Sequence, residues 1–152
     1  MSDENPTRIL AAIAHRPPHT AAGDQAFLNS NPAARWLEMT YAGALSFLRR
    51  PYSRDLNKAK AVVCGVPYDG ATSNRPGARL GPRAIRAASA ELGSCDSFPY
   101  GGNPFEALPT IDWGDLYIEP QLPHRVAADI EAGAREIIAG GAKLLALGGD
   151  HF

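Results

Sequence analysis

An aspartate and a histidine stand side by side in the segment "GGDH", directly after the apolar run "KLLAL"; they are Asp150 and His151. Three more aspartates follow or lie within short apolar runs: Asp69 in "GVPYDG", and Asp112 and Asp115 in "TIDWGDL". If these runs are parallel strands, their carboxyl ends meet at one edge of a sheet and the five side chains gather there. Carboxylates together with an imidazole favour a hard or borderline divalent metal ion.

A structural role for the aspartates competes with this metal-binding prediction. Aspartates at strand ends often accept hydrogen bonds from the backbone of the turn or helix that follows. For Asp69, Asp112 and Asp115 we favour this scaffolding role. For His151 we favour metal binding, for reasons given below.

The loop between the first apolar run and the next helix carries Asn74, Arg75 and Arg79. We expect a structural or subunit-interface role for these residues rather than a contact with substrate. The remaining candidates are expected to face solvent (His124) or to pack or line a pocket wall (Tyr68, Trp113).

Short apolar runs bounded by turn residues predict three buried strands. They begin near residue 59 in "AKAVVCGVPYD", lie around residues 108–112, and end the chain in "KLLALGG". Helices are predicted between them, so strand and helix alternate. This order predicts an α/β fold with three layers, α/β/α, and a mainly parallel sheet. With three strands the sheet is incomplete, and we expect further sequence to complete it.

Two helices are predicted in detail. The segment "GPRAIRAASAEL" starts with Gly81 as N-cap and Pro82 at the first helical position, and places Ile85, Ala88 and Leu92 on one face. The segment "LPHRVAADIEAGAREIIAGGA" begins near Pro123 and ends at Gly140. Its apolar stripe consists of Val126, Ile130, Ala134, Ile137 and Ile138, and Glu131 and Arg135 form a favourable pair one turn apart.

Composition bounds the class of protein. The chain has 152 residues, 45% hydrophobic and 20% charged, with a formal net charge of −1. A near-neutral balance gives no electrostatic reason to bind nucleic acid or an anionic membrane. The start "MSDENPTRIL" lacks a signal-peptide core, so we expect a cytoplasmic protein. A disulfide between Cys64, in an apolar run, and Cys95, in a loop-like segment, is therefore disfavoured.

Two regions are expected along the chain. Residues 1–30 lack clear periodicity and are predicted to be a mobile N-terminal arm, in which His15 and His19 are solvated rather than metal-bound. Residues 31–152 are predicted to form the α/β part, with a short helix around residues 32–39.

The segments in order resemble those of the ureohydrolases, the arginase and agmatinase family. The likeness rests on "GVPYDGATSNRPGARLGPRAIR", "TIDWGDL" and "GGDH" and covers roughly residues 45–152. The wording of "ATSNRPGARLGPRAIR" and "FPYGGNPFEALPTIDWGD" is most similar to the agmatinase branch.

This resemblance implies a hydrolase that converts agmatine and water to putrescine and urea with two manganese ions, a step of polyamine biosynthesis. It implies that His151 is one metal ligand and that Asp150 supports the site without binding metal. It also implies a homo-oligomer, a trimer or hexamer. No catalytic residue is assigned, and no substrate-binding residue is identified.

The chain departs from the family because segments like "DAH.D" and "D.D", which supply the other metal ligands, are absent. We therefore expect the N-terminal half of such an enzyme, cut after its first metal-ligand motif and inactive alone. A guanidinobutyrase or another guanidino-acid hydrolase is an alternative, and so is a non-catalytic remnant that associates with full-length subunits. A nucleotide-binding α/β module is disfavoured because no Gly-rich phosphate loop follows the first strand.

Overall fold

A computed structural model of the chain describes residues 41–92 and 96–151. Its centre is a parallel three-stranded sheet in the order β2-β1-β3. The strands are β1 (Ala61–Val66), β2 (Thr110–Asp115) and β3 (Lys143–Gly148). Strand β1, the run "AVVCGV", lies between the other two strands. Four consecutive residues of it are buried, as expected for a strand with covered faces and a partner on each side.

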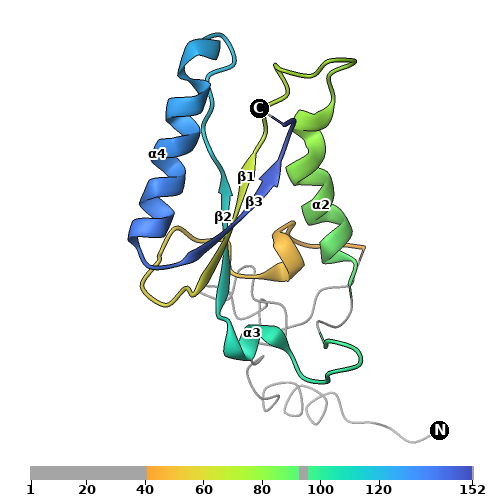
Figure 1. Ribbon diagram of the computed structural model, residues 1–152. Coiled ribbons are helices and arrows are strands. Elements are labelled where there is room, and N and C mark those ends of the chain that lie inside the picture. Colours follow the sequence, from red (N-terminus) through yellow and green to blue (C-terminus); the bar gives the residue numbers. More distant parts are fainter. Residues whose placement is uncertain (1–40, 93–95, 152) are drawn as a thin grey trace, which may run out of the picture.

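Helix α2 (Gly81–Ala90) and helix α4 (Val126–Ala139) lie on opposite faces of this sheet (Figure 1). The predicted α/β fold with α/β/α layers and a parallel sheet is therefore confirmed. Shorter elements connect the layers: η2 (Phe47–Arg49), η3 (Ala78–Leu80), α3 (Pro104–Ala107) and η4 (Pro123–Arg125).

The face covered by α4 holds the hydrophobic core of the described chain. Its buried residues are Val62, Cys64, Ile111, Trp113, Ile137 and Ala142. The predicted apolar stripe of this helix is largely confirmed, since Val126 and Ile137 are fully buried while Ile130 and Ala134 are half-buried. Ile138 was assigned to the stripe wrongly: it is 59% exposed, because it lies one residue, or 100°, beyond Ile137 around the helix.

The buried face of α2 differs from the predicted one. Ile85 and Leu92 are 40% and 58% exposed, and Ala88 is exposed as well. The helix instead buries Pro82, Arg86, Ser89 and Ala90. The apolar pattern failed here because the opposing strand presents carboxylates, and these can satisfy a buried arginine. The helix also begins at Gly81, with Leu80 rather than Gly81 as N-cap.

The strand predictions need two corrections. The second strand was placed around residues 108–112 but runs to Asp115, past a register irregularity opposite Val63 and Cys64 where Gly114 has a φ of 84°. The third strand was predicted to be buried, yet four of its six residues are exposed, with Leu145 at 49%. Both β2 and β3 are edge strands of the described sheet, but β2 also pairs with Tyr52, whereas β3 has no second neighbour there.

Several predictions lie outside the described residues. They concern the arm of residues 1–30 with His15 and His19, the helix around 32–39, and Cys95. None of the helices in the described part of the chain has the length and apolar character needed to cross a bilayer.

Candidate functional site

The carboxyl end of β3 turns sharply across the end of β1. The amide of Gly149 donates to the carbonyl of Val66 at 3.2 Å, and the amide of Asp150 donates to the carbonyl of Tyr68 at 2.9 Å. A Cβ atom on Gly149 would collide with that Tyr68 carbonyl oxygen. The glycine is therefore required by a close backbone approach, as its type suggests, and the neighbour it approaches is the segment that follows β1.

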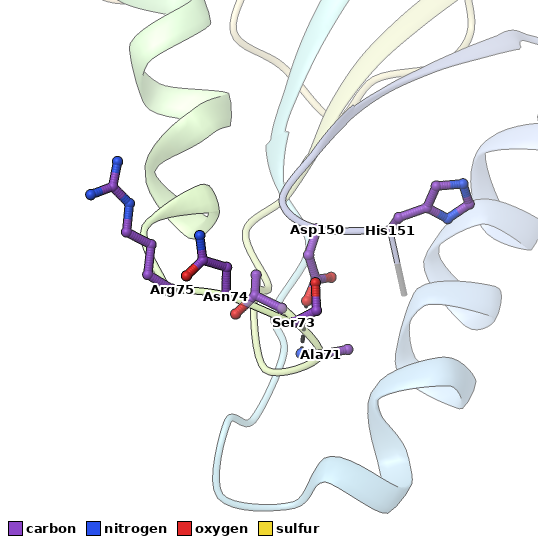
Figure 2. Close-up of a pocket in the computed structure, with 7 residues that line it drawn as sticks. Ala71, Ser73, Asn74, Arg75, Asp150 and His151 are labelled. Carbon is purple, nitrogen blue, oxygen red and sulfur yellow. Dashed lines mark hydrogen bonds between the residues drawn. The ribbon is translucent and has the colours of Figure 1, made fainter.

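Asp150 ties the next loop to this turn. Its Oδ2 accepts a hydrogen bond of 2.8 Å from the amide of Ala71, as Figure 2 shows. The carboxylate therefore holds the start of the loop, while the role of Asp150 in supporting a metal site stays a prediction. The imidazole of His151 is exposed and points away from Asp150 and the loop (Figure 2).

Between the loop and the end of β3 lies an open, polar pocket of about 500 Å³. Residues 71–75 line it on one side, and Asp150 and His151 line it on the other. Its size suits a small molecule. Arg75 and Asn74 are exposed on this loop.

Asp69 holds the other end of the loop. Its carboxylate accepts from the amides of Gly77 and Arg79, at 2.7 and 3.2 Å, and pairs with the Arg79 guanidinium at 2.6 Å. The hydrogen bond from Arg79 is the main cause that lowers the pKa of Asp69 to about 2. The scaffolding role favoured for Asp69 is confirmed, and so is a structural role for Arg79.

Asp112 does not lie at the edge where it was expected to gather with the other acids. It stands inside β2, fully buried, and both of its carboxylate oxygens accept from Arg86, at 2.7 and 2.9 Å. It also accepts from the amides of Phe47 and Gly114. Asp112 is therefore a scaffold residue whose hydrogen-bonding capacity is taken up within the protein.

Asp115 is nearer the edge but serves the same arginine. Its Oδ1 accepts from Arg86 at 2.6 Å, although the aspartate side chain is 41% exposed. Burial is the largest single influence on the pKa of Arg86 and acts to lower it, but the hydrogen bonds to both aspartates together outweigh it, so the pKa lies above its usual value. Sequence reasoning missed Arg86. The signal was present, because Pro82, Arg86 and Ser89 share a helical face at spacings of four and three.

The described residues do not form a complete metal site. Among residues 41–92 and 96–151, no group of three or more His, Cys, Asp and Glu side chains is placed to hold a metal ion. The predicted cluster of four carboxylates and one imidazole is thus wrong, because arginines neutralise three of the acids. His151 is exposed and able to act as one ligand, but these residues alone do not fit a manganese pair.

The other residues singled out from the sequence have plain roles. His124 is exposed in η4, as predicted, and Trp113 packs in the core at 4% exposure. Tyr68 is half-buried beside the Gly149 turn. Cys64 is a buried free thiol, and burial is the main cause that raises its pKa to about 11, so it is an inert core residue.

Comparison with known proteins gives consistent matches. The arginase family profile matches residues 59–152. An agmatinase from Chromobacterium violaceum is 45% identical over 130 residues, which cover 86% of this chain and 40% of the relative. Among solved structures, a hypothetical agmatinase from Burkholderia thailandensis has a TM-score of 0.77 and 46% identity, covering 85% of this chain and 41% of that one.

A more distant solved structure contains manganese. An oxidized formiminoglutamase from Trypanosoma cruzi, solved with Mn²⁺, has a TM-score of 0.55 and 25% identity, covering 65% of this chain and 34% of that one. The chain described here spans about two fifths of the length of the curated relatives it matches.

Proposed function

The chain belongs to the arginase family, and from that premise we propose that it is the N-terminal part of a manganese-dependent hydrolase that cleaves agmatine to putrescine and urea. The observation that carries the proposal is the 45% identity to an agmatinase over 86% of the chain. The exposed His151 beside a polar pocket at the carboxyl edge of the sheet supports it.

The residues of this chain have distinct tasks in the proposed enzyme. A neutral imidazole of His151 offers a ring nitrogen to a metal ion. Asp150 holds the pocket loop at Ala71, and Asp69 holds it at Gly77 and Arg79. Because the described residues do not fit two manganese ions, the remaining ligands are proposed to come from outside residues 41–92 and 96–151. Residues 31–152 would then be the first part of the catalytic domain.

A second candidate substrate class has one observation in its favour. Arg75 is exposed on the loop that lines the pocket, and no hydrogen bond or ion pair within the described residues engages its guanidinium. A guanidinium attracts a carboxylate and repels an ammonium group. A guanidino acid such as guanidinobutyrate is therefore the alternative substrate, and a remnant that pairs with full-length subunits is the alternative of another class.

The family resemblance supports a homo-oligomer, a trimer or hexamer. A cytoplasmic location is a further proposal, and so is the absence of activity from residues 1–152 taken alone, since segments like "DAH.D" and "D.D" are missing from them.

Urea release tests the proposed function. The product of the complete reading frame is purified, loaded with Mn²⁺, and assayed with agmatine and with 4-guanidinobutyrate. We expect urea from agmatine and loss of nearly all activity in His151→Ala. His124→Ala is the matched control, because His124 is an exposed histidine in η4 that does not line the pocket. Urea from guanidinobutyrate alone would favour the alternative substrate class, and no urea from either compound would contradict the proposal.

A further inference from the structure

We infer that Arg86 is a positioning residue for the candidate site: it fixes helix α2 on β2, and the first turn of α2 in turn fixes the backbone that carries Asp150 and His151. The inference deepens the proposed function and rests on it for its catalytic consequence. Its structural core stands on contacts of the described residues alone.

The first step is the attachment of α2 to β2. The Arg86 side chain is 6% exposed. Its guanidinium donates to both carboxylate oxygens of Asp112, to Asp115 and to the carbonyl of Gly114, at distances between 2.6 and 2.9 Å. Every one of these acceptors belongs to β2. A planar fork that donates in several fixed directions sets both the height and the rotation of the helix, which a point charge cannot do.

The acceptors themselves are held in place. The Asp112 carboxylate also accepts from the amide of Phe47 at 2.7 Å and from the amide of Gly114 at 2.9 Å. Ser89, one turn after Arg86, accepts from the amide of Leu48 at 2.9 Å. The carboxylate therefore has no freedom to follow a displaced arginine, and a change at Arg86 has to be absorbed by α2.

The first turn of α2 is packed against the ends of the other two strands. A Cβ atom on Gly81 would lie 2.8 Å from the carbonyl oxygen of Gly148, at the end of β3. A Cβ atom on Gly65, in β1, would lie 2.9 Å from the Cβ of Pro82 and would collide with the Asp115 carboxylate. With no spare room on either side, movement of this turn displaces the end of β3.

The end of β3 leads directly to the candidate ligand. Gly148 is followed by Gly149, which is wedged against Tyr68, and by Asp150, which holds the pocket loop. His151 comes next. The path from Arg86 to His151 thus runs through packed backbone, without a flexible side chain in between.

Amide hydrogen exchange measured by NMR on the chain tests the structural core. Arg86→Lys keeps the charge and loses the fork. We expect exchange at the Gly149 and Asp150 amides to accelerate about ten times more than exchange at the Ile137 amide in α4. A tenfold change is the size expected when a locally unfolding segment loses about one charge-assisted hydrogen bond. Asp115→Asn, a milder change at a part-exposed acceptor, should give the same pattern to a smaller extent if the lysine variant does not fold.

Ile137→Val is the matched control, because it destabilises the protein from the opposite face of the sheet. It should accelerate exchange at all these amides by similar factors. If Arg86→Lys and Asp115→Asn also accelerate all amides equally, or leave Gly149 and Asp150 unchanged, the positioning role is overturned.

Kinetics of the complete gene product test the catalytic consequence. Since Arg86 does not line the pocket, Arg86→Lys should lower kcat for urea release at least about fivefold with KM changed less than about twofold, as for a misplaced catalytic group. An unchanged kcat would overturn the positioning role. If the wild-type product releases no urea, the proposed function fails while the exchange experiment still decides whether Arg86 sets the backbone at Asp150.

Discussion

Helix α4 covers its face of the sheet with Ile137, which is fully buried among Val62, Ile111 and Trp113, whereas α2 covers the opposite face with Arg86, which is buried between Asp112 and Asp115. Apolar packing is non-directional and tolerates some sliding. A forked ion pair accepts one orientation and is costly when incomplete. The helix for which we propose the positioning role is thus attached by the more directional contact.

This difference matches the neighbourhood of each helix. The first turn of α2 lies against the end of β3, immediately before Asp150 and His151, while the core of α4 lies against the middle of the sheet. The aspartates near the proposed metal site hold the fold together instead of binding metal. Arg79 forms an ion pair with Asp69, and Arg86 forms ion pairs with Asp112 and Asp115.

Removing one side of the buried ion pair should have the largest effect. Asp112→Ala leaves the buried Arg86 with the part-exposed Asp115 as its remaining carboxylate partner and is expected to lower the free energy of unfolding by about 3–5 kcal/mol. Urea-induced unfolding followed by circular dichroism measures it. Glu136→Ala, an exposed acid on α4, is the control and should change stability by less than about 0.5 kcal/mol. Equal effects of the two variants would show that the polar face is not specially sensitive.

Truncation on the apolar face should cost less than breaking the ion pair, or at most as much. Ile137→Ala is expected to lower the free energy of unfolding by about 2–5 kcal/mol, because it removes a fully buried side chain and leaves a cavity. Ile138→Ala, at the next position and 59% exposed, should cost less than about 1 kcal/mol. A larger loss from Ile138→Ala would mean that the described core is on the wrong face of α4.

Most of the apolar face of the sheet, which α4 covers, was predictable from the sequence. Most of the polar face, which α2 covers with Arg86, was not. The run "AVVCGV" and the spacing of Val126, Ile130, Ala134 and Ile137 report burial directly, because hydrophobic periodicity follows the geometry of strand and helix. The spacing of Pro82, Arg86 and Ser89 in "GPRAIRAASAEL" allows Arg86 to face inward, but nothing local favours this face of the helix over the face that carries Ile85. That depends on Asp112, which is 26 residues away in the chain, so only the tertiary pairing determines it.

The candidate site was predictable in part for the same reason. A strand ending in "GGDH" predicts the turn that brings Asp150 and His151 to the carboxyl edge. The expectation that Asp112 joins them failed, because a strand end cannot be located to within a residue or two by pattern alone. β2 continues to Asp115 and leaves Asp112 inside.

A larger side chain in the turn at Gly149, between the end of β3 and Asp150, should lower stability by an intermediate amount. Gly149→Ala forces a Cβ against the Tyr68 carbonyl and is expected to cost about 1–3 kcal/mol of stability. In Gly148→Ala the nearest atom met by the new Cβ is 3.9 Å away, so thermal unfolding should show a smaller change. A Gly149→Ala protein as stable as the Gly148→Ala protein would disprove the close approach of the two segments.

Acid should loosen the pocket loop through Asp69, the smallest of these effects. The pKa of Asp69 is lowered from 3.8 to about 2 in the folded chain, so its contribution to stability is present above pH 4 and is lost as the pH falls towards 2. Stability measured at pH 5, 3 and 2 should therefore fall more steeply in the wild type than in Asp69→Asn. Parallel pH profiles for the two proteins would contradict the role of Asp69 in holding the loop.

The manganese content of the complete gene product tests most directly whether His151, and not the strand aspartates, meets the metal. Purified wild type, His151→Ala and Asp115→Asn are dialysed together and their bound manganese per subunit is measured. We predict that His151→Ala loses about one equivalent or more, while Asp115→Asn, which only loosens the backbone near His151, keeps most of the wild-type content. Loss of metal from Asp115→Asn with full retention in His151→Ala would contradict the assignment.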